Sequence, residues 1–109
     1  LTSQNLKIDW NKSIDLIEKK IRGLSPFPGA WTYFTNDNNK IRMKILKSSI
    51  IYIIHKNEPC KILVKNKEIL ISLKDGYLKC EEIQLENKKK MSAKSLLNGY
   101  KFSKNSFVL

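Results

Sequence analysis

The amino-acid sequence predicts a mainly β fold with flanking helices, arranged as a small open antiparallel barrel. Short runs rich in β-branched and aromatic residues follow one another from residue 30 to residue 85, and Asn, Asp, Gly or Pro separate them. An apolar stripe with helical spacing precedes these runs, and a short helical pattern follows them. Several short strands at this spacing are typical of a barrel. The 109 residues fit one domain, 1–109.

The first element, after an extended lead-in at residues 1–8, is a helix that ends near Leu24. Its apolar residues recur at steps of three and four, as one helix face requires: Ile14, Ile17, Ile21 and Leu24. Asn11 is the expected N-cap, because its side chain can accept hydrogen bonds from amides of the first turn. Gly23 can take the left-handed conformation that ends a helix, and Pro26 prevents the helix from continuing.

A rigid turn and a hairpin are predicted next. Two prolines constrain residues 25–29, and Ala30–Thr35 has the composition of a strand. Residues 36–39, Asn-Asp-Asn-Asn, tolerate the positive φ angles of a tight turn. Residues 40–47 alternate apolar with polar side chains and complete the hairpin.

Further strands are predicted across the middle of the chain. Ile50–Ile54 is a continuous apolar run that fits a buried strand, although a helical segment would look the same over this length. Residues 60–65 and 68–73 are two more strand candidates, and residues 74–76 form a turn with Gly. Residues 77–85 are the last strand candidate.

A short second helix is predicted near the end of the sequence. Ser92 is its expected N-cap, and Met91 can then pack on Leu96 as a hydrophobic staple. Gly99 is expected to end this helix. Residues 100–109 are aromatic and basic, and we expect them to be partly ordered.

The charge balance points to a polyanionic partner. The formal net charge is +11, from 21 basic and 10 acidic residues. Arg22 and Arg42 are the only arginines. Lysine is a mobile point charge suited to phosphate, whereas arginine suits base edges, so the composition favours recognition of a nucleic-acid backbone. A genome biased towards lysine codons is the alternative explanation for part of the excess.

Other classes receive little support from the sequence. No apolar run approaches the roughly 18 residues of a membrane helix, and the first residues do not resemble a signal peptide. Cys60 and Cys80 have no CxxC spacing, so we expect reduced cytosolic thiols and no metal site. A disulfide remains possible on the count alone. We expect a cytoplasmic protein without a membrane partner.

Two specific motifs, in this order, carry a family resemblance. The first is Pro26-Phe27-Pro28-Gly29-Ala30-Trp31, and the second is Lys88-Lys89-Lys90-Met91-Ser92-Ala93. Shorter matches accompany them: Ile8-Asp9-Trp10, Ile21-Arg22-Gly23-Leu24, Asp75-Gly76, Gln84-Leu85-Glu86 and Asn98-Gly99-Tyr100. Together they resemble the C-terminal domain of methionyl-tRNA formyltransferases, with residues 48–72 matching least. Leu85 stands where the family usually has proline, Asn87 where it has glycine, and Lys90 where arginine is common; Asn can still supply a positive φ.

The resemblance implies an open barrel of the oligonucleotide-binding type that holds initiator transfer RNA. In such an enzyme this domain lies against the inside of the L-shaped RNA. A separate N-terminal domain carries the catalytic residues and 10-formyltetrahydrofolate. The chain is therefore expected to be a fragment of a longer, monomeric enzyme, with no catalytic residue and no cofactor of its own.

The residues expected to contact ribose-phosphate are Lys88, Lys89, Lys90, Lys94, Arg42 and Lys44. Lys88–Lys90 precede the second predicted helix, where ammonium groups and helix amides would both favour an anion. Arg42 and Lys44 share one face of an alternating strand, which can follow a nucleic-acid backbone. The alternatives are a solvated loop for the three lysines and an ordinary wet sheet face for the strand.

Other conspicuous side chains favour structural roles. Trp10, Phe27 and Trp31 could stack on bases, but their place at a helix end beside prolines favours packing. Arg22 lies in the last turn of the first helix, where a cation offsets the helix dipole. His55 follows an apolar run with no neighbouring carboxylate to orient it, so a structural or exposed histidine is expected.

Two alternatives to tRNA binding stay open. The chain could be a structural or dimerisation C-terminal module of a sugar-nucleotide formyltransferase, which would self-associate without RNA affinity. It could also be a general single-strand binder, which would prefer unfolded oligonucleotides to folded transfer RNA.

Overall fold

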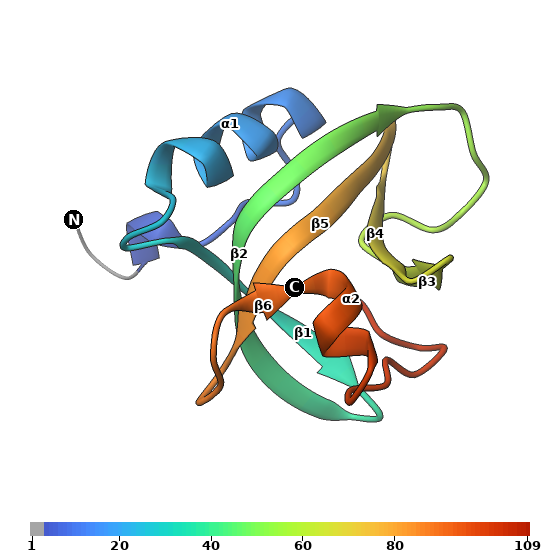
Figure 1. Ribbon diagram of the computed structural model, residues 1–109. Coiled ribbons are helices and arrows are strands. Elements are labelled where there is room, and N and C mark those ends of the chain that lie inside the picture. Colours follow the sequence, from blue (N-terminus) through green and yellow to red (C-terminus); the bar gives the residue numbers. More distant parts are fainter. Residues whose placement is uncertain (1–3) are drawn as a thin grey trace.

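The computed structural model describes residues 4–109, and it confirms the predicted mainly β class (Figure 1). Within these residues a 3₁₀ turn, η1, and two α-helices accompany six strands. The elements are η1 (Gln4–Leu6), α1 (Ile14–Leu24), β1 (Ala30–Asn36), β2 (Asn39–Tyr52), β3 (Ile62–Lys65), β4 (Glu68–Leu73), β5 (Gly76–Leu85), β6 (Met91–Ser92) and α2 (Ala93–Leu97). None of the helices among these described residues is long and apolar enough to cross a bilayer.

All strand pairs are antiparallel, in the order β1-β2-β5-β4-β3, and β6 adds to β5. The long strand β2 pairs first with β1 and then with β5, and its register shifts around Lys47. Such a bulge bends a strand and increases its twist, which lets one strand serve two parts of a curled sheet. Figure 1 shows β2 sweeping across the molecule with α1 along it.

The C-terminal tail occupies the gap between the two ends of this sheet. Val108 forms an antiparallel bridge with Phe34 of β1, and Phe107 forms one with Lys61 just before β3. The Ile62 amide also donates to the Ser106 carbonyl at 2.9 Å. Residues 100–109 are thus more structured than the partial order expected from the sequence, because their backbone groups join β1 to β3 and bring the sheet towards a barrel.

The core lies between α1 and the inner face of the curled sheet. The predicted helical stripe is buried at Ile14, Ile17 and Ile21. Inward-facing strand residues such as Phe34 and Ile83 are fully buried as well. Each large side chain of this kind contributes about 1.5–3 kcal/mol by leaving water, so the 109 residues carry a substantial core of their own.

The predicted N-terminus of α1 is wrong by two residues. Ser13, rather than Asn11, is the N-cap, and its Oγ accepts from the Leu16 amide at 3.3 Å. The Asn11 amide instead donates to the Asp9 carboxylate at 3.0 Å, in a local turn that precedes the helix. Gly23 lies inside α1 and does not end it; the C-cap is Ser25, next to Pro26.

The lead-in prediction also needs correction. Residues 4–6 form a 3₁₀ turn rather than an extended segment, and residues 1–3 lie outside the described part of the chain. The extended part is short: the Ile8 amide donates to the Trp31 carbonyl at 2.8 Å, and Lys7 bridges to Trp31 in parallel.

The apolar run Ile50–Ile54 is not a separate buried strand. β2 continues without interruption from the hairpin to Tyr52, and Ile53 and Ile54 lie beyond its end. Ile54 is 98% exposed, and Tyr52 and Ile53 are exposed as well. Apolar composition predicts the strand, but the end of β2 extends past the core, so the side chains there are exposed and not buried.

The predicted turns and the second N-cap are confirmed. Asp37 and Asn38 both have positive φ angles, 49° and 69°, as a two-residue hairpin turn requires. Asn87 has a φ of 62°, so it supplies the positive φ expected of it. Ser92 Oγ accepts from the Ser95 amide at 3.1 Å, and α2 ends at Leu97, just before Gly99. The two-residue strand β6 was not predicted.

Candidate nucleic-acid interface

The candidate interface is the outer face of β1 and β2. Alternate residues of β1, such as Thr32 and Phe34, are buried, so the residues between them face outward. The tight hairpin turn fixes the register, which places Trp31 opposite Lys44 and Tyr33 opposite Arg42. The predicted pair Arg42 and Lys44 therefore does share one face, and each cation stands across from an aromatic ring.

Cations cover the aromatic rings of this face. The guanidinium carbon of Arg42 lies 3.9 Å from the centre of the Trp31 ring, and Lys40 Nζ lies 4.2 Å from the Tyr33 ring. Lys7 Nζ lies 5.8 Å from the centre of the Trp31 ring and donates a hydrogen bond to the Leu109 carbonyl. Such cation–π contacts orient the charged groups over the rings. Sequence reasoning missed Lys40 and Lys7, although the two-residue turn, once assigned, determines that Lys40 lies beside β1.

The loop between β5 and β6 adjoins this face through backbone bonds to β2. The Glu86 amide donates to the Arg42 carbonyl at 2.9 Å, and the Arg42 amide donates to the Glu86 carboxylate at 3.3 Å. Gln84, which lies opposite Lys44, donates from Nε2 to the Lys88 carbonyl at 2.9 Å. The structure thus brings the backbone of the predicted lysine run next to the predicted strand pair. A hollow of 220 Å³ there is lined by residues 42–44 and 84–87.

The three loop lysines are exposed and largely available. Lys90 Nζ lies 3.8 Å from the Glu82 carboxylate, and Lys88 Nζ lies 5.5 Å from the Tyr100 ring. An exposed ion pair of this kind contributes only about 0–1 kcal/mol, so it does not prevent Lys90 from binding phosphate. Lys94 is also exposed, but it lies on α2, which follows β6 in the chain. We name Arg42, Lys44 and Lys88–Lys90 together the β1–β2 cationic surface.

The expected contribution of a helix N-terminus to this surface is not supported. α2 has only five residues, and the Ser95 amide already donates to Ser92 Oγ. The candidate anion-binding groups of the loop are therefore its lysine side chains and not helix amides.

Lysines also lie on other sides of the molecule, including Lys12 and Lys19 near and on α1 and Lys65 and Lys67 around the β3–β4 turn. Net charge alone therefore does not define a site. The β1–β2 cationic surface differs because strand pairing places Arg42 and Lys44 on one face and the Trp31 ring holds the Arg42 guanidinium.

Comparison with known proteins gives the family. Residues 1–101 match the family described as formyl transferase, C-terminal domain. The chain belongs to this family. Methionyl-tRNA formyltransferase of Flavobacterium johnsoniae is 40% identical over 108 residues, which are 99% of this chain and 34% of that protein. The enzymes of the same name from Flavobacterium psychrophilum and Ruminiclostridium cellulolyticum are 35% and 32% identical, over 99% and 86% of this chain. The chain therefore spans about a third of the length of these curated relatives, and the resemblance inferred from its motifs is confirmed.

In this formyl transferase C-terminal domain, two of the three conspicuous aromatic residues have packing roles. Trp10 donates from Nε1 to Thr32 Oγ1 at 2.9 Å, and Trp31 is only 4% exposed beneath its cations. The packing role predicted for Phe27 is wrong, because its side chain is 85% exposed. The turn that carries Phe27 projects from the body of the domain, so neighbouring prolines do not imply burial.

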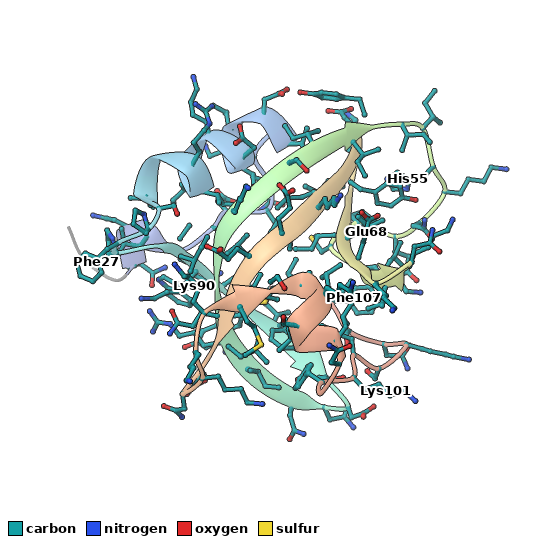
Figure 2. All side chains as sticks on the ribbon, in the orientation of Figure 1. Phe27, His55, Glu68, Lys90, Lys101 and Phe107 are labelled. Carbon is teal, nitrogen blue, oxygen red and sulfur yellow. The ribbon has the colours of Figure 1, made fainter. Side chains whose placement is uncertain are left out.

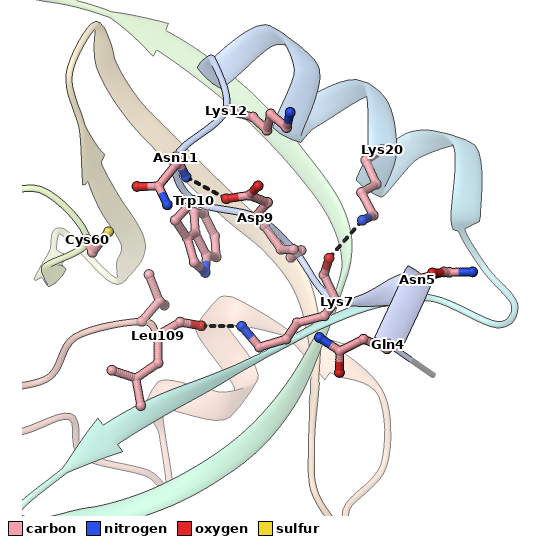
Figure 3. A pocket seen from close by; sticks show the side chains of 12 residues that line it. Gln4, Asn5, Lys7, Asp9, Trp10, Asn11, Lys12, Lys20, Cys60 and Leu109 are labelled. Atoms are coloured by element: carbon pink, nitrogen blue, oxygen red, sulfur yellow. Dashed lines mark hydrogen bonds between the residues drawn. The ribbon is translucent and has the colours of Figure 1, made fainter. Parts of the chain in front are cut away.

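In a larger hollow near the N-terminal end of the domain, two of the three lining lysines make hydrogen bonds within the domain (Figure 3). It measures 780 Å³ and is lined by residues 4–5, 7–12, 20, 60 and 108–109. Lys7 Nζ donates to the Leu109 carbonyl at 2.8 Å, and Lys20 Nζ donates to the Lys7 carbonyl at 2.7 Å. These cations hold chain segments together, so this hollow is a weaker candidate than the β1–β2 cationic surface.

His55 and the cysteines are structural in the domain. His55 Nε2 lies 2.7 Å from the Leu73 carbonyl oxygen, and the ring stacks on Tyr77 with centres 4.5 Å apart. Cys60 and Cys80 are free thiols, and burial raises the pKa of Cys80 to about 12.

Arg22 lies in the last turn of α1, as predicted, and pairs with Glu18 at 3.1 Å. Within residues 4–109 no group of three or more His, Cys, Asp or Glu side chains could hold a metal ion.

Proposed function

We propose that this domain binds initiator transfer RNA through the β1–β2 cationic surface. Its role is to position the methionylated acceptor end for N-formylation by the catalytic N-terminal domain of the same enzyme. Such positioning of a substrate lowers an activation barrier by several kcal/mol, up to about 7–11 kcal/mol when geometry is ideal. The relatives' name, methionyl-tRNA formyltransferase, supports this assignment of the substrate.

The single observation that carries the proposal is the junction of β2 with the β5–β6 loop. The Arg42 backbone bonds to Glu86, so exposed Lys88–Lys90 lie at the end of the strand that carries Arg42 and Lys44. In this proposal, cations from two distant parts of the sequence act together as one surface. Lysine-rich surfaces bind phosphates without reading base edges, which suits recognition of a folded RNA by its backbone.

Titration of the chain with initiator transfer RNA at increasing potassium chloride tests the proposal. The affinity is expected to fall as salt rises, because each neutralised phosphate releases condensed counterions. Elongator transfer RNA of similar size serves as the comparison for specificity. Absence of binding at low salt, or an affinity that does not depend on salt, would contradict the proposal.

The chemistry belongs to the rest of the enzyme in this proposal. The N-terminal domain binds 10-formyltetrahydrofolate and carries the catalytic residues, whereas this domain needs no cofactor. The whole protein is a monomer in the cytoplasm, where its RNA substrate is found. Joining the N-terminal domain to this one should increase kcat/KM for methionylated initiator transfer RNA beyond that of the N-terminal domain alone.

One observation favours a second candidate function, dimerisation as in the C-terminal modules of sugar-nucleotide formyltransferases. Tyr52, Ile53 and Ile54 form consecutive exposed apolar side chains at the end of β2, and contiguous apolar surface marks protein interfaces. Sedimentation equilibrium of the chain and of an Ile54→Glu variant decides between the candidates. A dimer that Ile54→Glu dissociates would favour dimerisation, and a monomer at all concentrations would favour the RNA-binding role alone.

A further inference from the structure

Phe27 presents an aromatic ring to solvent at the turn between α1 and β1. Its side chain is 85% exposed, and Pro26 beside it is exposed as well. Figure 2 shows Phe27 projecting from the edge of the molecule, on the side where Lys90 is labelled. Covering an exposed aromatic ring with a partner removes apolar surface from water and is favourable, so this position suits a contact residue.

The turn that carries Phe27 is held firmly at both ends. The Gly29 amide donates to the Leu24 carbonyl at 2.9 Å, which ties the turn back to α1. Gly29 has a φ of +88°, and a Cβ there would lie only 3.0 Å from Leu46 Cδ2. Because the backbone is already fixed, binding at Phe27 requires little additional ordering, and preorganisation of this kind favours affinity.

The same packing places the turn beside the β1–β2 cationic surface. A Cβ on Gly29 would lie 3.2 Å from Lys44 Cδ, so the aliphatic stem of Lys44 passes directly over the turn. Lys44 in turn lies opposite Trp31 on one strand and Gln84 on the other. Gly29, two residues after Phe27 in the same turn, is therefore packed against the stem of a cation of the proposed RNA surface.

We propose that Phe27 stacks on an unpaired base of the bound transfer RNA, next to a phosphate that Lys44 contacts. This inference rests on the proposed function. An aromatic ring beside cations is the arrangement by which proteins hold single-stranded nucleotides, with stacking on the base and ammonium groups on the backbone. Bases within a duplex are covered on both faces by their neighbours, so a ring at the rim of the surface can stack only on an unpaired or terminal base. Trp31 cannot take this role, because it is almost fully buried beneath Arg42.

The experiment measures the affinity of initiator transfer RNA for the unmodified chain and for Phe27→Ala, Phe27→Trp and Val64→Ala, each over a series of potassium chloride concentrations. Val64→Ala is the matched control, because it shortens another exposed apolar side chain, on β3. Loss of stacking in Phe27→Ala is expected to weaken binding about 5- to 10-fold, the lower part of the range for base–aromatic stacking. Phe27→Trp is expected to restore the affinity, and Val64→Ala to leave it unchanged.

Salt dependence separates stacking from the removal of a phosphate contact. Phe27→Ala removes no cation, so the slope of log affinity against log salt should equal that of the unmodified chain. Its thermal unfolding should also be unchanged, because Phe27 is exposed.

Unchanged affinity in Phe27→Ala would overturn the stacking inference while the proposed function stands. A smaller salt slope would show that Phe27 merely positions Lys44, and an effect on self-association would assign the ring to a protein contact; either result overturns the inference. An unmodified chain that binds no transfer RNA would overturn the proposed function itself.

Discussion

The Arg42 guanidinium lies over the Trp31 indole, with its carbon 3.9 Å from the ring centre. Trp31 belongs to β1 and Arg42 to β2, and the hairpin register places Trp31 opposite Lys44, two residues further along β2. The contact is therefore diagonal across the strand pair, a distance that long and aromatic side chains can span. It fixes one cation of the proposed RNA surface and covers most of the tryptophan.

Replacing Arg42 with lysine should separate the shape of this cation from its charge. Lysine keeps the charge but loses the planar stacking of the guanidinium, so the free energy of unfolding should fall by about 0.5–1 kcal/mol. The salt slope of RNA binding should not change, because the charge is retained. Urea denaturation measures the first effect, with Arg22→Lys as the control: Arg22 makes an exposed ion pair with Glu18 on α1. Equal losses of stability in the two variants would argue against a specific role for the Trp31 contact.

Gly76 permits the close approach of β5 to β2, and Gly76→Ala should be strongly destabilising. Its φ is +153°, and an added Cβ would lie 2.0 Å from the Ile51 carbonyl oxygen. Relief of that clash requires movement of paired backbone, so we expect a loss of roughly 3 kcal/mol or more. Gly23→Ala is the matched control, because nothing lies within 4 Å of a Cβ at that helical position. Chemical denaturation should find Gly23→Ala stabilised by about 0.5–1 kcal/mol; a tolerated Gly76→Ala would contradict the described strand packing.

Ser13 should matter more to stability than Asn11. Ser13 Oγ accepts from the Leu16 amide, whereas it is the backbone amide of Asn11 that bonds to Asp9. Ser13→Ala is therefore expected to cost about 1 kcal/mol, the usual effect of losing an N-cap. Asn11→Ala should cost clearly less, and thermal unfolding of the two variants compares them. The opposite order would restore Asn11 as the cap expected from the sequence.

Cys80 should make stability fall at alkaline pH. Burial raises its pKa in the folded domain to about 12, from an ordinary value of 9.0. Between these two values the unfolded chain releases the thiol proton while the folded domain retains it, so the free energy of unfolding decreases by up to about 1.4 kcal/mol per pH unit. Urea denaturation from pH 8 to pH 11 should show this decrease in the unmodified chain.

Cys80→Ala is the control for that measurement, since other groups also titrate in this range. The variant should be less stable at every pH because it leaves a cavity, but its stability should fall less steeply above pH 9. Parallel pH profiles for the two proteins would argue against a buried, protonated Cys80. Burial also raises the pKa of the half-exposed Cys60, so a thiol reagent should modify Cys60 slowly and Cys80 only on unfolding.

Local sequence patterns predicted most of the elements, and non-local pairing explains the errors. Helical periodicity located the buried face of α1, and turn chemistry located the hairpin whose register aligns Arg42 and Lys44. The tail has no strand periodicity, however, and its bridges to Phe34 and Lys61 connect residues far apart in sequence. Local patterns do not predict the order of strands in a sheet either, so they could not predict that the lysine run lies close to Arg42.

Burial was the other quantity that composition could not decide. Ile54 and Phe27 are both large and apolar, and both were expected to pack, yet both are exposed. Each lies where the chain leaves the body of the domain, at the end of β2 or at the turn before β1. Whether a residue is buried depends on how the surrounding chain segments pack, and residue type alone does not determine that packing.

The most direct test of the central claim compares two triple variants that carry the same net charge. One is Lys88→Ala, Lys89→Ala, Lys90→Ala in the proposed surface, and the other is Lys56→Ala, Lys65→Ala, Lys74→Ala, exposed lysines outside it. The affinity for initiator transfer RNA is measured over a potassium chloride series. We predict that the first variant binds more weakly than the second and that its salt slope is smaller by about 0.7–0.9 for each phosphate that the removed lysines neutralise. Equal affinity and equal slope in the two variants would contradict the claim, because they would show that overall charge, and not this surface, holds the RNA.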